Sequence, residues 1–131
     1  MRILLADHHA EPCLALRTLL EEQPGLDLIG EAVDAQGLLK LAEKQTADLI
    51  LLDGKLPGIS IDDLIAKLRA LEPRPVVVWM SSEFEGSKVL LKCGVDAFVC
   101  KADGPDKLLK MLRQYAKQTS IKEDANINKV P

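Results

Sequence analysis

Short apolar runs alternate with segments of helical periodicity along most of this chain, and this alternation constrains the fold more than any other feature. The apolar runs predict five strands, at residues 2–6, 26–32, 49–52, 76–80 and 97–100. The segments that follow them place apolar side chains at three- and four-residue steps, which is the spacing of one helix face. Alternating strands and helices form a parallel sheet with right-handed connections and helices on both faces. We therefore predict an α/β fold with a doubly wound, five-stranded parallel sheet.

Capping residues support the expected helix starts. Asp34 precedes the second expected helix, and Ser60 precedes the third with Asp63 three residues on, which resembles a capping box. Pro105 stands at a favoured first-turn position of the last helix. The segment 83–93 is predicted as a weaker helix. Beyond residue 117 the sequence becomes polar and loses its apolar stripe, so we expect one domain over 1–117 and a polar tail or truncated linker over 118–131.

Charge and composition exclude several classes of protein. The net charge is −3 and no Lys/Arg block is present, which argues against nucleic-acid binding by this chain itself. No apolar run is long enough to span a membrane, so we expect no membrane contact. The three cysteines form no CxxC pair, which is typical of a reducing compartment. We therefore expect a cytoplasmic protein.

Chemically active side chains follow the apolar runs at their carboxyl ends. The first run ends in Asp7-His8, the third ends in Asp53, the fourth is followed by Ser81, and the fifth by Lys101. In an open α/β sheet, ligands bind outside the carboxyl ends of the strands. Each of these residues alone has an ordinary structural explanation, such as a helix cap or a solvated lysine. Together, at one edge of the sheet, they indicate a site.

The chemistry that this set of side chains suits is phosphoryl transfer onto a carboxylate. Asp53 would be the nucleophile, and a metal ion held by carboxylates would screen its repulsion from the incoming phosphoryl group. Lys101 would pair with phosphoryl oxygens as a point charge, and the Ser81 hydroxyl would donate a hydrogen bond to the same group. Such a site positions and neutralises charge, which is what phosphoryl transfer generally requires.

Three segments carry a family resemblance. LLADHH, LILLDGKLPG and GVDAFVCKADGPDKLLK resemble the receiver domain of two-component response regulators, and the similarity covers roughly residues 1–117. The chain also resembles receivers that precede a LuxR-type output domain. The resemblance implies a flavodoxin-like sheet with strand order 2-1-3-4-5. It further implies a signalling protein, not an enzyme, that takes a phosphoryl group on Asp53 from a histidine kinase or a phosphotransfer protein.

The resemblance also implies roles for further residues. Mg²⁺ would be held by Asp7, by Asp53 and by the backbone carbonyl of Lys55, with His8 at the position of a second acidic ligand. Phe98 would be the switch aromatic, which changes rotamer when the hydroxyl of the fourth strand moves toward the phosphoryl group. The face made by the expected helix at 83–93, the fifth strand and the last helix would be the surface for a homodimer.

Several alternatives remain open from the sequence. An imidazole in place of a carboxylate should weaken Mg²⁺ binding. His8 is therefore compatible with a zinc or manganese ligand, with a protonated group that replaces part of the cation charge, or with a site that has lost metal-dependent chemistry. Asp7 suits either a metal ligand or a helix cap, and Ser82 competes with Ser81 for the hydroxyl position. The alternative function is a phosphorylation-independent receiver that acts as a protein-binding module.

Overall fold

The computed structural model describes residues 1–81 and 94–128, and its sheet has the predicted topology. Five parallel strands lie in the order β2-β1-β3-β4-β5. They span β1 (Arg2–Ala6), β2 (Asp27–Ala32), β3 (Leu49–Asp53), β4 (Val76–Ser81) and β5 (Ala97–Cys100). The prediction of a doubly wound flavodoxin-like sheet is confirmed. The helix predicted at 83–93 lies outside the described residues.

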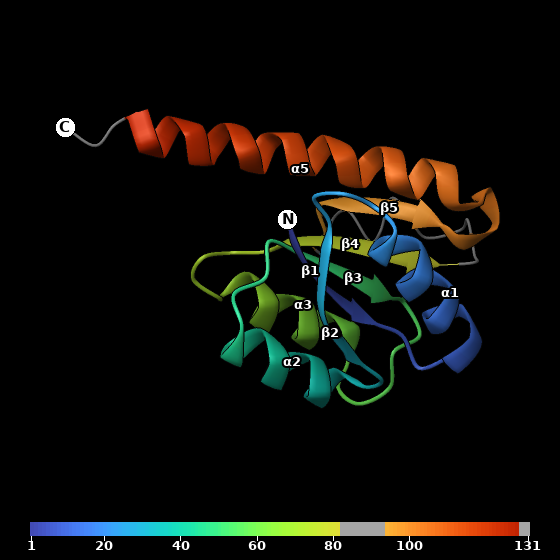
Figure 1. Ribbon diagram of the computed structural model, residues 1–131. Helices are drawn as coiled ribbons and strands as arrows, with labels where there is room; N and C mark the ends of the chain where they lie inside the picture. Colours follow the sequence, from blue (N-terminus) through green and yellow to red (C-terminus); the bar gives the residue numbers. More distant parts are fainter. Residues whose placement is uncertain (82–93, 129–131) are drawn as a thin grey trace.

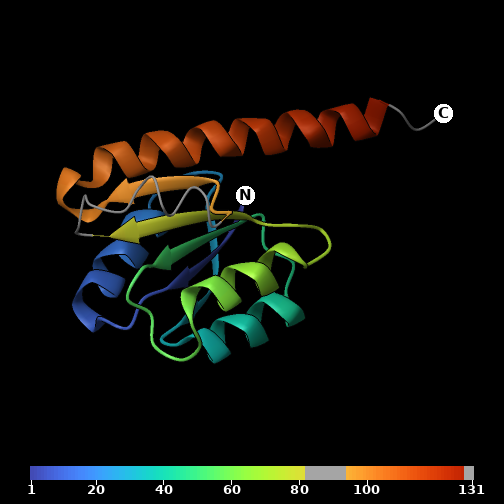
Figure 2. The same cartoon turned by 180° about the vertical axis from the view of Figure 1, so that it is seen from behind.

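Helices cover both faces of the sheet, as Figures 1 and 2 show from opposite sides. They are α1 (Ala10–Glu21), α2 (Ala35–Lys44), α3 (Ile61–Arg69) and α5 (Pro105–Asn128), with a 3₁₀ turn, η1, at Lys101–Asp103. Successive strand residues point to opposite faces. Ile3 and Leu5 of β1 therefore pack in the core under α1 and α5, whereas Leu4 packs in the core under α2 and α3. A strand buried on both faces must be apolar throughout, which explains the continuous apolar runs.

Side chains cap two of the helices at the predicted starting residues. Asp34 Oδ1 accepts a hydrogen bond of 2.7 Å from the amide of Gly37 at the start of α2. Ser60 Oγ accepts one of 3.3 Å from the amide of Asp63 at the start of α3. Each bond satisfies an amide that has no partner within its helix. Both capping predictions are confirmed, and Pro105 is the first residue of α5, as predicted.

The last helix extends beyond the predicted domain boundary. The apolar stripe ends before residue 118, which led us to expect a polar tail or truncated linker beyond it, and α5 continues without a break to Asn128. Figure 1 shows its C-terminal part extending past the sheet. An apolar stripe is needed only where a helix packs on a core, and residues 118–128 contain no Gly or Pro, the two residue types that oppose a helix most strongly. The domain boundary near 117 and the polar tail or truncated linker over 118–131 stay predictions.

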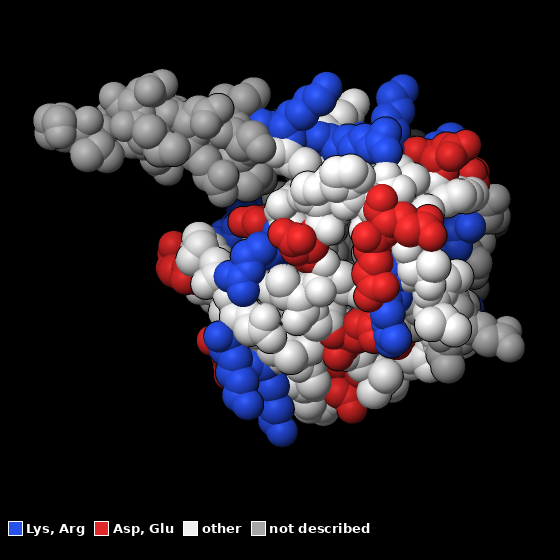
Figure 3. All heavy atoms as spheres, in the orientation of Figure 1, with Lys and Arg blue, Asp and Glu red and all other residues white. Residues whose placement is uncertain are grey.

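The described part of α5 is amphipathic. Leu108 and Leu112 are buried against the sheet. The outer surface is basic, and Figure 3 shows blue side chains gathered over α5. The exposed basic residues of this helix are Lys107, Lys110, Arg113 and Lys117. Among the described residues, no helix combines the length and the hydropathy that a membrane span requires.

Candidate functional site

Two buried aspartates stand at the carboxyl edge of neighbouring strands. Asp7 directly follows β1, and Asp53 is the last residue of β3. The two strands pair with Ala6 beside Leu52, so the residues after them meet at the same edge of the sheet. Asp7 is 1% exposed and Asp53 is 2% exposed, and they are the buried charged residues of the described chain. Buried carboxylates need partners that compensate for the loss of water.

Lys101 supplies a positive charge to both carboxylates. It follows β5, and its Nζ lies 3.0 Å from Asp7 Oδ2 and 3.6 Å from Asp53 Oδ1. Burial by itself raises the pKa of Asp7. Hydrogen bonds from the His9 backbone amide and from Lys101, together with the Lys101 charge, outweigh burial and lower the pKa of Asp7 below its ordinary value. Both carboxyl groups therefore have an ammonium partner.

The two histidines contact the remaining carboxylate oxygens. His8 Nδ1 lies 3.4 Å from Asp53 Oδ2, and His9 Nδ1 lies 3.1 Å from Asp7 Oδ1 and 3.6 Å from Asp53 Oδ2. Lys101 and the imidazoles thus approach different oxygens of each aspartate. The four side chains Asp7, His8, His9 and Asp53 offer ligand atoms that all lie within 4.8 Å of one another.

His9 is the site residue that the sequence analysis missed. It is the N-cap residue of α1, without a side-chain capping bond. Its backbone amide donates a 2.9 Å hydrogen bond to Asp7 Oδ1. Asp7 therefore binds the amide of the cap residue and is not itself the cap. The doubled histidine in the segment DHH was the available signal.

The other predicted site residues lie around this pair of carboxylates. The Lys55 amide donates a 3.2 Å hydrogen bond to Asp53 Oδ1. Ser81 ends β4 beside Cys100, one residue beyond Met80, which pairs with Asp53. The structure therefore places Ser81 at the correct edge of the sheet, whereas Ser82 lies outside the described residues.

Phe98, the predicted switch residue, is half-buried on β5. It pairs in register with Trp79 of β4 and packs against the core on the α2 and α3 side. The glycine after Asp53 makes room for Trp79, because a Cβ atom at Gly54 would lie 2.6 Å from three atoms of the indole ring. The only tryptophan of the chain is therefore in contact with the residue next to Asp53.

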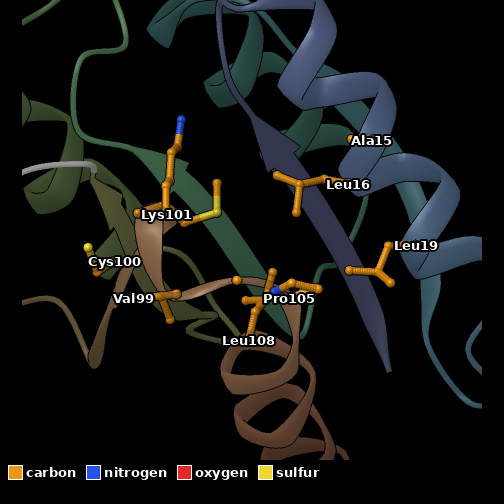
Figure 4. A pocket seen from close by; sticks show the side chains of 10 residues that line it. Ala15, Leu16, Leu19, Val99, Cys100, Lys101, Pro105 and Leu108 are labelled. Atoms are coloured by element: carbon orange, nitrogen blue, oxygen red, sulfur yellow. The ribbon is translucent and has the colours of Figure 1, made fainter.

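An apolar cavity lies on the other side of Lys101. Its volume is about 370 Å³, and its walls come from α1, the ends of β4 and β5, and the start of α5. Leu16 and Leu19 face Leu108 across it, and the Lys101 amine points away from Pro105 and Leu108 (Figure 4). The stem of Lys101 thus lines the cavity while its ammonium group reaches the aspartates, which is the usual division of a lysine between apolar and polar surroundings.

Comparison with known proteins places this geometry in a family context. The family model of the response regulator receiver domain matches residues 3–113. The nitrate/nitrite response regulator protein NarL of Escherichia coli (strain K12) is 34% identical over 125 residues, which cover 94% of this chain and 58% of NarL. The chain thus spans little more than half the length of this curated relative.

Solved structures share the fold. A LuxR-family two-component response regulator from Aurantimonas sp. SI85-9A1 aligns with a TM-score of 0.79 at 24% identity, over 89% of this chain and 85% of that chain. The isolated REC domain of RcsB from Salmonella enterica serovar Typhimurium, with the phosphomimetic BeF3-, aligns with a TM-score of 0.78 at 22% identity, over 86% of both chains. At these identities the structural matches show the fold alone.

Proposed function

The chain belongs to the receiver domain family of response regulators, and we propose that it accepts a phosphoryl group on Asp53 from a phosphohistidine of a histidine kinase or a phosphotransfer protein. One observation carries this proposal. Asp53 Oδ2 is buried and has no hydrogen-bond partner, while the other oxygen of the same carboxylate lies 3.6 Å from the Lys101 ammonium. An oxygen without a partner keeps its lone pairs available for attack on phosphorus.

The proposed step exchanges one bond to phosphorus for another. Asp53 Oδ2 forms a P–O bond, the P–N bond of the donor phosphohistidine breaks, and the released imidazole keeps the electron pair and takes a proton from water. Lys101, now shared between Asp7 and Asp53, would turn toward the phosphoryl oxygens. The Ser81 hydroxyl would donate a hydrogen bond to the same group. The residues thus position charge, as phosphoryl transfer generally requires.

A divalent cation suits part of this site. When bound, it would neutralise the negative charge that gathers between the phosphoryl group and the carboxylates. Asp7 and Asp53 offer the oxygen ligands that Mg²⁺ prefers, and the Lys55 carbonyl is a third oxygen donor that the family resemblance implies. His8 and His9 do not suit Mg²⁺, because imidazole nitrogen is a softer donor. We therefore assign the cation to Asp7 and Asp53, with Mg²⁺ as the ion that the family implies.

The output of the switch is also part of the proposal. Phe98 is half-buried beside Trp79, so a change of its rotamer would alter the surface of β5. This surface, with α5 and the segment 83–93, is the proposed dimer face. A cytoplasmic location is proposed because a histidine kinase would meet its partner there, and because the buried thiol of Cys100 is free.

Intact-mass measurement tests the phosphoryl transfer. The purified chain is incubated with a small-molecule phosphodonor and Mg²⁺, Mn²⁺ or Zn²⁺ in turn. We expect a phosphoryl adduct in the wild type and in Asp106→Asn, which changes an exposed aspartate of α5, and none in Asp53→Asn. Absence of the wild-type adduct with every donor and cation would contradict the proposal.

A further inference from the structure

We propose that the pocket formed by Asp7, His8, His9 and Asp53 selects a zinc-class transition-metal ion over Mg²⁺. The ion would bind Asp53 Oδ2, the oxygen that the proposed function uses as nucleophile. The inference therefore concerns the resting site before phosphoryl transfer, and it rests on the proposed function for its role in signalling. Ion binding itself depends only on the four side chains. Two carboxylates and two imidazoles form a mixed oxygen and nitrogen donor set, which suits Zn²⁺ and its neighbours in the first transition row.

The distances between the donor atoms suit a small tetrahedral site. Ligands about 2.0–2.1 Å from Zn²⁺ in tetrahedral geometry lie roughly 3.3 Å from one another. His9 Nδ1 is 3.1 Å from Asp7 Oδ1, and Asp53 Oδ2 is 3.4 Å from His8 Nδ1 and 3.6 Å from His9 Nδ1. These three pairs need only small side-chain rotations. The widest pair, at up to 4.8 Å, needs the largest adjustment.

Lys101 does not contact the two carboxylate oxygens that face the imidazoles, although Asp7 Oδ1 also accepts a hydrogen bond from the His9 amide. Its ammonium approaches Asp7 Oδ2 and Asp53 Oδ1, whereas the imidazoles approach Asp7 Oδ1 and Asp53 Oδ2. With neutral imidazoles, the two carboxylates and the ammonium sum to one negative charge, so a divalent ion enters a pocket of favourable sign. One oxygen of each aspartate is therefore held by Lys101, and the other faces the ion.

The lack of a hydrogen-bond partner at the buried Asp53 Oδ2 is an independent observation that points to a ligand at this site. The Asp53 side chain is 3% exposed, and this oxygen has no hydrogen-bond partner although two ring nitrogens lie within 3.6 Å. A buried carboxylate oxygen without a donor is costly, and a metal ion would remove that cost. The two ring nitrogens lie near Asp53 Oδ2 but donate no hydrogen bond to it. This arrangement suits nitrogens that bind the same metal ion as the oxygen.

The imidazoles also decide which ion enters. Mg²⁺ requires oxygen ligands in near-octahedral geometry and gains little from a nitrogen donor, whereas Zn²⁺ and Co²⁺ bind imidazole well. The His8 side chain is 34% exposed and that of His9 is 49% exposed, so both imidazoles stand on the solvent side of the buried carboxylates. The ring centroids lie 3.8 Å apart, so the two imidazoles are in contact with each other.

The test measures ion binding without a phosphodonor. Chelator-treated protein is titrated with Zn²⁺ or Mg²⁺ by calorimetry, and with Co²⁺ by visible absorption, which becomes intense in a tetrahedral site. We expect Zn²⁺ to bind at least about tenfold more tightly than Mg²⁺. His8→Ala and His9→Ala should each weaken Zn²⁺ binding by about tenfold or more. Glu43→Gln, which changes an exposed carboxylate on α2, should bind Zn²⁺ like the wild type.

The outcomes separate this inference from the proposed function. The chain has two histidines in all, so unchanged Zn²⁺ affinity in the double variant His8→Ala/His9→Ala would overturn the inference. Equal affinities for Mg²⁺ and Zn²⁺ in the wild type would overturn it as well. His8→Asp should tighten Mg²⁺ binding and weaken Zn²⁺ binding, and the reverse would contradict it. If Zn²⁺ fails to bind while the Asp53 adduct still forms, only the inference fails. If Zn²⁺ binds but no adduct forms with any cation, only the proposed function fails.

Discussion

Replacing Lys101 with methionine should destabilise the folded protein, because it leaves two buried carboxylates without their cation. Methionine keeps most of the apolar stem that lines the neighbouring cavity, so the change mainly removes charge. Lys101 Nζ lies 3.0 Å from Asp7 and 3.6 Å from Asp53, and both aspartates are almost fully buried.

The distances set the magnitude. At an effective dielectric constant of about 20, the two contacts correspond to roughly 5.5 and 4.6 kcal/mol of Coulomb attraction. Desolvation of the ammonium and of the carboxylates cancels much of this sum. Removing one partner of a buried ion pair costs about 3–5 kcal/mol. Because the Lys101 side chain is 25% exposed, we expect the lower end, about 3 kcal/mol.

Urea unfolding at neutral pH in the presence of EDTA measures this loss. Lys107→Met is the matched control, because Lys107 pairs with Asp103 at 3.4 Å but its side chain is 71% exposed. An exposed pair contributes about 1 kcal/mol or less, so the control should unfold close to the wild type. The contrast between the two variants isolates the effect of burying the charges.

The pH dependence gives a second check. In the variant, Asp7 loses the ammonium that helps to lower its pKa while burial still raises that pKa, so protonation of Asp7 relieves its repulsion from Asp53 as the pH falls. In the wild type, the lowered pKa of Asp7 means that stability is lost as the pH falls through the same range. The difference in unfolding free energy between the two proteins should therefore shrink toward acid. Equal stability of Lys101→Met and wild type at neutral pH, or a loss that does not change with pH, would refute the reasoning.

Two further predictions concern the packing and the titration of the site. Gly54→Ala should destabilise the protein by about 1–3 kcal/mol in urea unfolding, because the new methyl group meets the Trp79 ring at 2.6 Å. The double variant Gly54→Ala/Trp79→Leu should lose less than the sum of the single losses, and strict additivity would exclude this contact as the cause. Asp7 contributes stability above its unfolded pKa, and this contribution is lost as the pH falls through its lowered folded pKa. Asp7→Asn should therefore show a shallower loss of stability below about pH 4 than the wild type, and parallel acid-unfolding curves would contradict the assigned pKa shift.

Much of the fold could be predicted because its signals are local. The five apolar runs identified all five strands, and Asp34 and Ser60 cap the helices that they were expected to start. The alternation implied a parallel sheet, which brings the ends of β1, β3 and β5 to one edge and predicted that Asp7, Asp53 and Lys101 would meet. The family resemblance supplied the strand order, which alternation alone leaves open.

The missed features depend on context that the local pattern does not carry. α5 continues past the end of its apolar stripe, because a helix that leaves the core needs propensity but no buried face. His9 is the N-cap residue of α1, and its side chain also reaches Asp7. The backbone conformation at the cap sets the direction of this side chain, and the sequence pattern does not give that conformation. Gly54 makes space for Trp79, which is 25 residues away in the sequence, so no local pattern could indicate this contact.

The sequence by itself determined the elements, the two-sided burial of the strands and the identity of the side chains at the strand ends, because these follow from short-range periodicity and local capping. Only the tertiary structure decided how the charges are shared. Lys101 is 94 residues from Asp7 in the chain, and its ammonium holds one oxygen of each aspartate while His8 and His9 face the other. The relative positions of the ends of β1, β3 and β5 and of the start of α1 determine which side chain contacts which carboxylate oxygen. These four chain segments come together only in the folded protein. This arrangement is what makes DHH a candidate binding site for a metal ion as well as the end of a strand.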